Sequence, residues 1–132
     1  MAAEEVGVDQ DYVGNKLINM GEQSLDSSTV LTPPLFAVNQ SNYNPVGLQS
    51  ATLLRISATS PSSVTGLIEP TAPVWKFLWV VNIGVSNITL TNLDGTSGAN
   101  NQFAIGSNIV LQSNKGVFLL YDQTSKKWRA DR

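Results

Sequence analysis

The chain contains neither cysteine nor histidine. Without cysteine it forms no disulfide and no thiolate metal site. Without histidine it lacks the base of Ser-His-Asp and Cys-His catalytic systems, and it lacks every imidazole metal ligand. The Gly-rich phosphate-binding loops of standard spacing are also missing from the sequence. Because these absences remove the commonest enzyme classes, we expect no catalytic residues, no metal site and no cofactor.

Charge is scarce as well, because charged residues make up 14% of the chain against ~25% in an average soluble domain. The net charge of −2 provides no basic footprint for phosphates, so no nucleic-acid partner is expected. The N-terminus lacks signal-peptide features and no window is long and apolar enough to span a bilayer, so we expect no membrane partner. A surface this poor in charge is often buried against partner proteins.

The charges that are present lie mainly near the two ends. Residues 1–26 hold six acidic side chains against Lys16, and residues 115–132 hold five basic side chains against two acidic ones. The two ends are either simply solvated or meet between neighbouring subunits. Residues 1–26 contain no good strand and are interpreted as an extended N-terminal arm, either disordered or held by a partner. The apolar positions that such a partner would contact are Tyr12, Val13, Leu17, Ile18 and Met20.

From residue 27 the apolar positions alternate instead of following helical spacing, and turn-forming residues separate them. No amphipathic helix is visible, and Ser113–Gly116 is expected to close a tight hairpin. We therefore predict an N-terminal arm over 1–26 and an all-β domain over 27–132, an antiparallel β-sandwich or jelly-roll-like fold. Its predicted strands are 51–57, 64–68, 74–82, 87–92, 108–111, 117–122 and 126–130, with shorter apolar segments at 29–32, 35–38 and 103–105.

The strand predicted over 74–82 has the strongest signal, with aromatic and β-branched residues on both faces. We expect it to be covered on two sides. Trp75, Phe77 and Trp79 share one of its faces. This aromatic stripe is interpreted either as core or as a subunit interface, where aromatic residues are enriched, with carbohydrate stacking as a third possibility.

The carboxylates of the β-domain are few: Glu69, Asp94, Asp122 and Asp131. Glu69 and Asp94 are the candidates for a glycosidase-like pair, but both stand in turn-like contexts where acids are routine. Asp94 followed by Gly95 is interpreted as a turn, because no neighbouring acid supplies further oxygen ligands for calcium. We therefore expect that the protein is not an enzyme.

Tyr121 and Trp128 flank a short turn that begins at Asp122. Both rings are placed to cover the end of a sandwich, while the Asp122 carboxylate accepts hydrogen bonds from turn amides. These three residues are therefore predicted to form a structural turn.

An ordered series of short motifs runs through the C-terminal half. An apolar strand ending in Asn and Gly (Leu78–Gly84) precedes an Ile-Thr-Leu strand (Ile88–Leu90) and an Asp-containing loop from Asp94 to Phe103. The series ends in Leu119–Asp122 and Lys127–Arg129. In order and spacing, residues 77–129 resemble a β-domain module of bacteriophage virion proteins that occurs in capsid decoration proteins, head fibres and tail-fibre segments.

The chain departs from that module at two places. Gln102 stands before the Phe where the module usually has Arg, and Asn114–Gly116 replaces a Pro-Gly type of turn. Both departures affect loop contacts and leave the order of the strands unchanged.

The resemblance implies a trimeric β-domain that projects from a phage particle and attaches through its N-terminal segment, which makes the arm the capsid anchor. The expected function is a capsid decoration (cement) protein, made in the host cytoplasm, that binds the major capsid protein on the outer surface of the virion and stabilises the shell. The alternative is a tail or head fibre receptor-binding module that recognises a host surface glycan or protein, and a free lectin is a third possibility.

Overall fold

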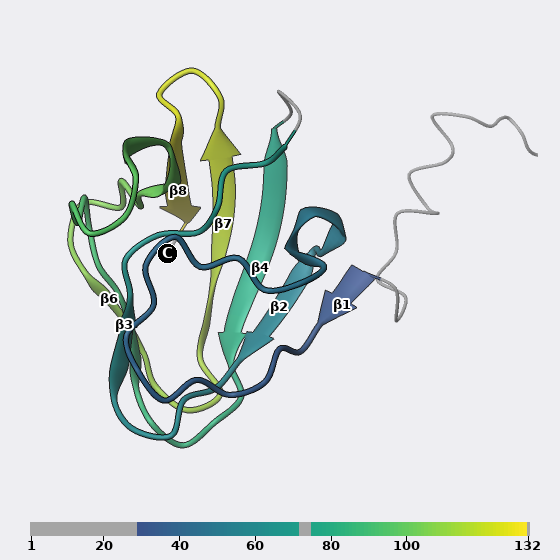
Figure 1. The fold of residues 1–132 in the computed structure, drawn as a ribbon, viewed down its shortest axis with the longest axis vertical. Helices are drawn as coiled ribbons and strands as arrows, with labels where there is room; N and C mark the ends of the chain where they lie inside the picture. Colours follow the sequence, from purple (N-terminus) through teal and green to yellow (C-terminus); the bar gives the residue numbers. More distant parts are fainter. Residues whose placement is uncertain (1–28, 72–74, 132) are drawn as a thin grey trace, which may run out of the picture.

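A computed structural model describes residues 29–71 and 75–131. Within them, one sheet has five strands in the order β1-β2-β4-β7-β8, and a second has three in the order β3-β5-β6 (Figure 1). The all-β class predicted from the sequence is confirmed. The strands are β1 (Val30–Leu31), β2 (Leu53–Ile56), β3 (Ser62–Val64), β4 (Lys76–Asn82), β5 (Ile88–Leu90), β6 (Ile109–Leu111), β7 (Gly116–Asp122) and β8 (Lys127–Asp131), with short 3-10 helices η3 (Leu48–Ser50) and η4 (Ala99–Asn101) in the connections.

Both sheets are mixed, which corrects the antiparallel arrangement expected from the sequence. β1 and β4 each pair with β2 in parallel, and β3 pairs with β5 in parallel. The pairs β4–β7, β7–β8 and β5–β6 are antiparallel. Two of the parallel pairs arise because the chain alternates between sheets: β3 of the small sheet lies between β2 and β4 in sequence, and β4 of the large sheet lies between β3 and β5. One intervening strand in the other sheet returns the chain in its original direction, as β3 does between β2 and β4, whereas the two strands β5 and β6 return it reversed, so that β7 is antiparallel to β4.

The turn before β7 is present, but it does not make a hairpin as predicted. The Lys115 amide donates to the Gln112 carbonyl at 3.0 Å, and Asn114 adopts the left-handed conformation with φ of 65°. β6 and β7 nevertheless belong to different sheets, and β7 pairs with β4 instead. The turn therefore carries the chain from one layer to the other.

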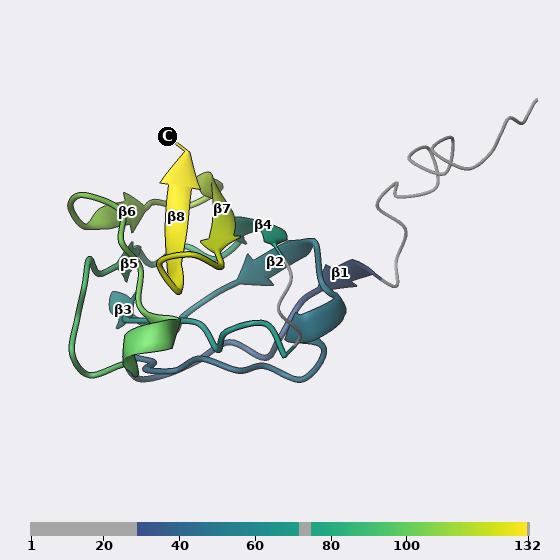
Figure 2. The same ribbon diagram turned by 90° about the horizontal axis from the view of Figure 1, so that it is seen from above.

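One apolar core lies between the two sheets and the loops that cover them. Alternation in the large sheet directs Leu54, Leu78, Val80 and Leu119 into this core, where all four are buried. Ile88 and its neighbours enter it from the small sheet. Figure 2 shows residues 32–52, before β2, and residues 65–71, after β3, lying to one side of the large sheet. Among the residues that the structure describes, no comparable layer covers the opposite side of β2, β4 and β7, where Phe77 and Trp79 are exposed.

In the part of the chain that the structure describes, no helix is long and apolar enough to cross a membrane.

Candidate functional site

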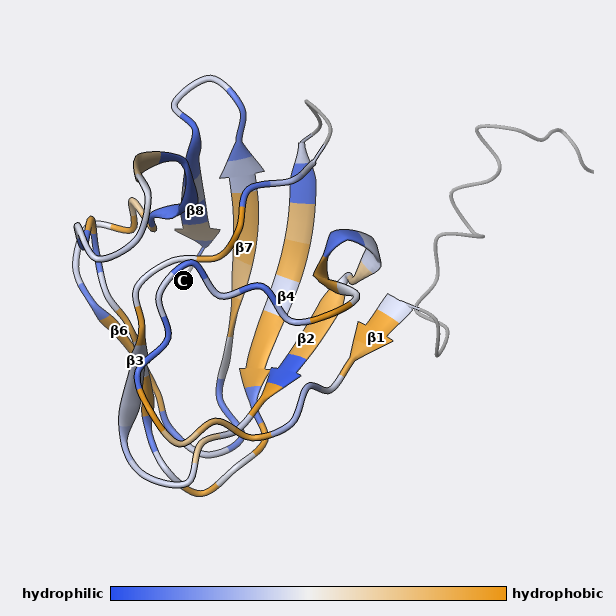
Figure 3. Cartoon of the chain, in the orientation of Figure 1, coloured by the Kyte–Doolittle hydropathy of each residue, from blue (hydrophilic) through white to orange (hydrophobic). Residues whose placement is uncertain are grey.

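The outward side of the large sheet bears an apolar surface, which we call the aromatic face: Leu53, Phe77, Trp79, Phe118 and Leu120. Strand alternation places these side chains opposite the core-facing ones. The strand register sets Trp79 between Leu53 and Phe118, and it sets Phe77 opposite Leu120. Figure 3 shows apolar residues running side by side through β2, β4 and β7. A well-ordered sheet thus presents apolar side chains to solvent across three neighbouring strands.

The aromatic rings of this face contact one another. Phe77 stacks on Phe118 with ring centroids 5.5 Å apart, and Trp79 lies 5.7 Å from the same Phe118 ring. The indole of Trp79 also reaches over Gly116, where a Cβ would lie 3.1 Å from its Nε1 atom and 2.7 Å from the Val80 carbonyl oxygen. Because these contacts hold the rings in place, little side-chain freedom remains to be lost when a partner binds.

Two open hollows flank the stacked rings. The larger, of about 370 Å³, is lined by Thr52, Leu53, Phe77, Trp79 and Phe118. The smaller, of about 200 Å³, is lined by Phe77, Phe118, Leu120, Arg129, Ala130 and Asp131. Phe77 and Phe118 line both hollows, and such a surface favours contact with a protein surface of matching shape.

The aromatic stripe predicted from the sequence therefore lies at the surface, and the core interpretation of it is wrong. Trp75, Phe77 and Trp79 are 56%, 55% and 47% exposed. The expectation that this strand is covered on both sides is wrong as well, because only the side bearing Leu78 and Val80 is buried. The sequence shows that the two faces differ, but both are apolar, and nothing in the alternation itself says which one meets the core.

Sequence reasoning missed the contributions of Leu53, Phe118 and Leu120 to this surface. Part of this surface could be predicted from the sequence, since the alternation of residues 117–122 puts Phe118 and Leu120 on one face of their strand. The pairing of β7 with β4, which brings that face beside Phe77 and Trp79, follows only from the tertiary structure.

Charged side chains stand at the margins of the aromatic face. Arg55 lies on β2, where it donates to the Thr32 hydroxyl at 2.9 Å. Arg129 and Asp131 lie on β8, on the other side of the face. Arg129 Nε contacts the Asp122 carboxylate at 3.3 Å. The margin of the aromatic face, which we call the rim, is therefore basic on the β2 side. On the β8 side it carries the acidic Asp131 beside the Arg129–Asp122 ion pair, whose charges cancel.

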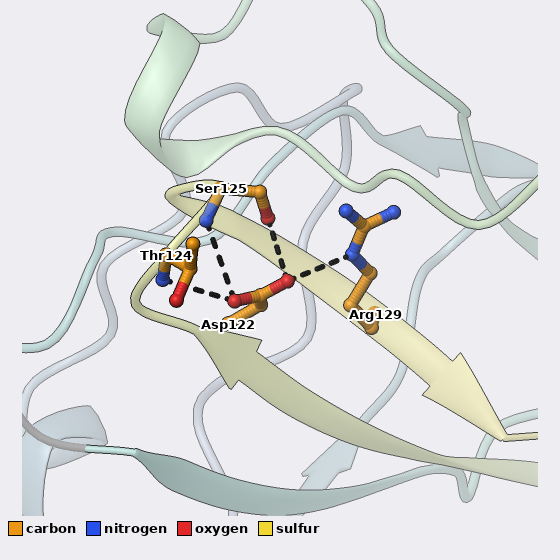
Figure 4. A network of polar contacts seen from close by, with 4 residues as sticks. All are labelled: Asp122, Thr124, Ser125 and Arg129. Carbon is orange, nitrogen blue, oxygen red and sulfur yellow. Dashed lines mark hydrogen bonds and ion pairs between the residues drawn. The ribbon is translucent and has the colours of Figure 1, made fainter.

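The predicted structural turn at Asp122 has the expected contacts (Figure 4). Its Oδ1 accepts hydrogen bonds from the amides of Thr124 at 2.9 Å and Ser125 at 3.3 Å, and its Oδ2 accepts one from the Ser125 hydroxyl at 2.8 Å. The Ser125 hydroxyl, then the turn amides and Arg129, hold the pKa of Asp122 below its usual value. The turn connects β7 to β8 and so positions the edge of the aromatic face.

We predict that Asp122→Asn lowers the melting temperature near neutral pH and that the difference from the parent disappears in acid. A carboxyl whose folded pKa is depressed stabilises the fold above its unfolded pKa of ~3.9, and this stability is lost as pH falls through the folded pKa. Thermal melts from pH 7 to pH 2 measure the effect. Ser125→Ala, which removes one donor, is expected to show a smaller difference, and a constant difference down to pH 2 would contradict the assignment.

Tyr121 and Trp128, the two aromatic residues of the structural turn predicted from the sequence, are both fully buried. Their rings pack edge to face, with ring centroids 5.0 Å apart. The Tyr121 hydroxyl donates to the Asn100 carbonyl at 2.7 Å, and the Trp128 indole donates to the Leu67 carbonyl at 2.9 Å. Burial, followed by the charges of Glu69 and Asp122, raises the pKa of Tyr121 to about 12. Both residues thus tie loops of the small-sheet side to the large sheet.

The carboxylates considered for catalysis or calcium hold local contacts. Asp94 Oδ1 accepts hydrogen bonds from the Thr96 amide at 2.9 Å and the Thr96 hydroxyl at 2.8 Å, which together lower the pKa of Asp94. Glu69 accepts a hydrogen bond from the Asn100 side chain at 3.3 Å. Among residues 29–71 and 75–131, no three acidic side chains gather into a group that would hold a metal ion. The Asp94 turn agrees with the sequence interpretation.

The arm positions Tyr12, Val13, Leu17, Ile18 and Met20 lie outside the described residues. Their predicted role as an anchor stays a prediction.

Comparison with known proteins found no matching family model, no matching curated protein and no matching solved structure.

Proposed function

We propose that this chain is a structural protein of a bacteriophage particle: a decoration (cement) protein that binds the outer capsid surface as a homotrimer and stabilises the shell. The observation that carries the proposal is the exposed aromatic face, an ordered apolar surface on a chain with few charges. Apolar patches of this kind mark sites where proteins associate. The phage context rests on the motif series in residues 77–129.

The proposed mechanism is association without chemistry. Each copy buries its aromatic face against other proteins, and the N-terminal arms contact the major capsid protein around the attachment point. Three linked arms on one trimer raise the effective concentration of each remaining arm once the first has bound. Moderate contacts then add up to stable attachment, and each trimer bridges neighbouring coat subunits against the internal pressure of the particle.

We expect deletion of residues 1–26 to leave a folded oligomer that no longer attaches to shells, because the core that joins the two sheets is built from residues between Phe36 and Trp128. Co-sedimentation of the purified protein with undecorated particles measures attachment, and circular dichroism checks the fold.

A matched variant keeps the length and charge of the arm but replaces Val13, Leu17, Ile18 and Met20 with serine. It separates apolar anchoring from mere tethering and is expected to lose attachment as the deletion does. Full decoration by the truncated protein would rule out the arm as the anchor.

One observation favours the alternative, a fibre module that recognises a host glycan or protein. An open hollow of about 320 Å³ combines the exposed Trp75 ring with the polar side chains of Gln49, Thr71 and Lys76. A half-exposed indole beside amide and hydroxyl groups is a surface on which a sugar ring stacks. Counting copies in electron-microscopy maps of whole particles distinguishes the functions, since decoration requires many copies over the shell and a fibre requires few.

A further inference from the structure

The aromatic face is large enough to form the centre of a stable interface. With ~150–250 Å² for a whole aromatic side chain, the exposed parts of Phe77 and Trp79, at 55% and 47%, amount to roughly 200 Å². Leu53, Phe118 and Leu120 add partly exposed area beside them. Each partner in a standard interface contributes ~800 Å², with an apolar centre and a polar rim. The face and its margins have this composition.

The rim charges are arranged asymmetrically across the face. Arg55 pairs in register with Val81 on β4, whereas Asp131 pairs with Phe118 on β7. β2 and β8 are three strand spacings apart, so the two charges lie roughly 15 Å apart across the sheet. Neither has an ion partner among the described residues. A partner that fits must offer an acidic group opposite β2 and a basic group opposite β8.

We infer that the partner of the aromatic face is a second copy of this chain, related by an axis parallel to the strands. Such an axis sets the β8 side of each copy against the β2 side of the next. Asp131 of one copy then lies at the same edge as Arg55 of its neighbour, offset by two residues or roughly 7 Å along the strands, which the long arginine side chain can span. The stacked rings of Phe77 and Phe118 meet apolar surface. Two-fold and three-fold arrangements about this axis both have this property. The inference rests on the proposed function, which buries the aromatic face against another protein, and it adds that this protein is a second copy of the chain.

The first experiment measures the mass of the purified chain by sedimentation velocity over a wide range of concentrations, with no phage particle present. The parent chain is expected to form dimers or trimers. Phe77→Thr/Trp79→Thr is expected to associate at least roughly 100-fold more weakly, because it removes two aromatic anchors. The matched control, Val85→Thr/Val110→Thr, changes apolar residues that are 90% and 52% exposed elsewhere, and it should associate like the parent.

The second experiment reverses the rim charges, which lie on the surface and leave the core intact. Arg55→Glu and Asp131→Arg are each expected to weaken association roughly tenfold, because each sets like charges against one another. The double variant Arg55→Glu/Asp131→Arg restores opposite charges only if both residues meet across an interface between copies. Recovery of association in the double variant supports the inference, and additive losses overturn it.

The two proposals fail in different ways. A parent chain that stays monomeric at every concentration, or a Phe77→Thr/Trp79→Thr variant that associates normally, overturns this inference. If the same protein still decorates particles in the co-sedimentation experiment, the decoration proposal stands and the coat protein covers the face. If the protein associates as inferred but never attaches to particles, the decoration proposal fails and the interface stands.

Discussion

Trp128→Ala is expected to lower the free energy of unfolding by about 3–5 kcal/mol, the range for removing a buried aromatic side chain. The indole is fully buried, packs edge to face on Tyr121 and donates to the Leu67 carbonyl. Domains of this size have a total stability of ~5–15 kcal/mol, so this single change removes much of it. Guanidinium unfolding followed by far-UV circular dichroism measures the loss.

Two further tryptophan variants separate packing from hydrogen bonding. Trp128→Phe keeps an aromatic ring but leaves the buried Leu67 carbonyl without its donor, so a loss of about 1–3 kcal/mol is expected. Trp75→Ala makes the same deletion at a position that is 56% exposed, and it should cost under about 1 kcal/mol. Equal losses at positions 75 and 128 would mean that burial does not control the effect.

Asn82→Ala is expected to be the other severe change, with a loss of about 3 kcal/mol or more. Asn82 is fully buried at the end of β4. Its Nδ2 donates to the carbonyls of Ser86 and Leu111, both at 2.8 Å, and its Oδ1 accepts from the Gly84 amide at 3.0 Å. The side chain therefore joins the large sheet to β6 of the small sheet, and its removal leaves three backbone groups without their partner. Chemical unfolding measures this loss.

Asn82→Asp tests the direction of those hydrogen bonds through pH. The variant has nearly the same shape, but an ionised carboxylate faces two carbonyl oxygens and has no proton to donate. Burial raises the folded pKa of this carboxyl above its unfolded value of ~3.9. A raised folded pKa means that stability is present in acid and is lost as pH rises through the folded pKa.

The stability deficit of Asn82→Asp relative to the parent should therefore be smallest below about pH 4 and should grow toward neutral pH. The Asn82→Ala deficit serves as the control and should show no such trend. Unfolding curves at a series of pH values compare the two, and a deficit of Asn82→Asp that is independent of pH would contradict the assigned geometry.

The positions of most strands followed from local sequence. The predicted ranges 51–57, 87–92, 108–111 and 117–122 each contain or overlap a strand of the structure. Short runs of β-branched and aromatic residues bounded by turn formers are local signals, and they need no knowledge of the partner strand. The turn at Asp122 was predictable for the same reason, since the donors within the turn, Thr124 and Ser125, lie within three residues of Asp122.

The strand after Pro61 was placed less well. Val64–Ile68 was predicted as a strand, but β3 is Ser62–Val64, and Gly66 and Leu67 form only isolated bridges. A Cβ on Gly66 would lie 2.5 Å from the Asn101 carbonyl oxygen, so the chain there passes close to another loop instead of continuing a ladder. Such a long-range contact leaves no trace in local alternation.

Local sequence was sufficient to determine the all-β class, most strand positions and the Asp122 turn, because each depends on residues adjacent in the chain. Strand direction, the choice of sheet and the location of the aromatic face were decided by the tertiary structure. β4 is apolar on both faces, so Leu78 and Trp79 satisfy the same pattern, and only the packing of loops and the small sheet on one side buries Leu78 and leaves Trp79 exposed. The physical reason is that alternation specifies two faces, whereas long-range packing selects the one that is removed from water.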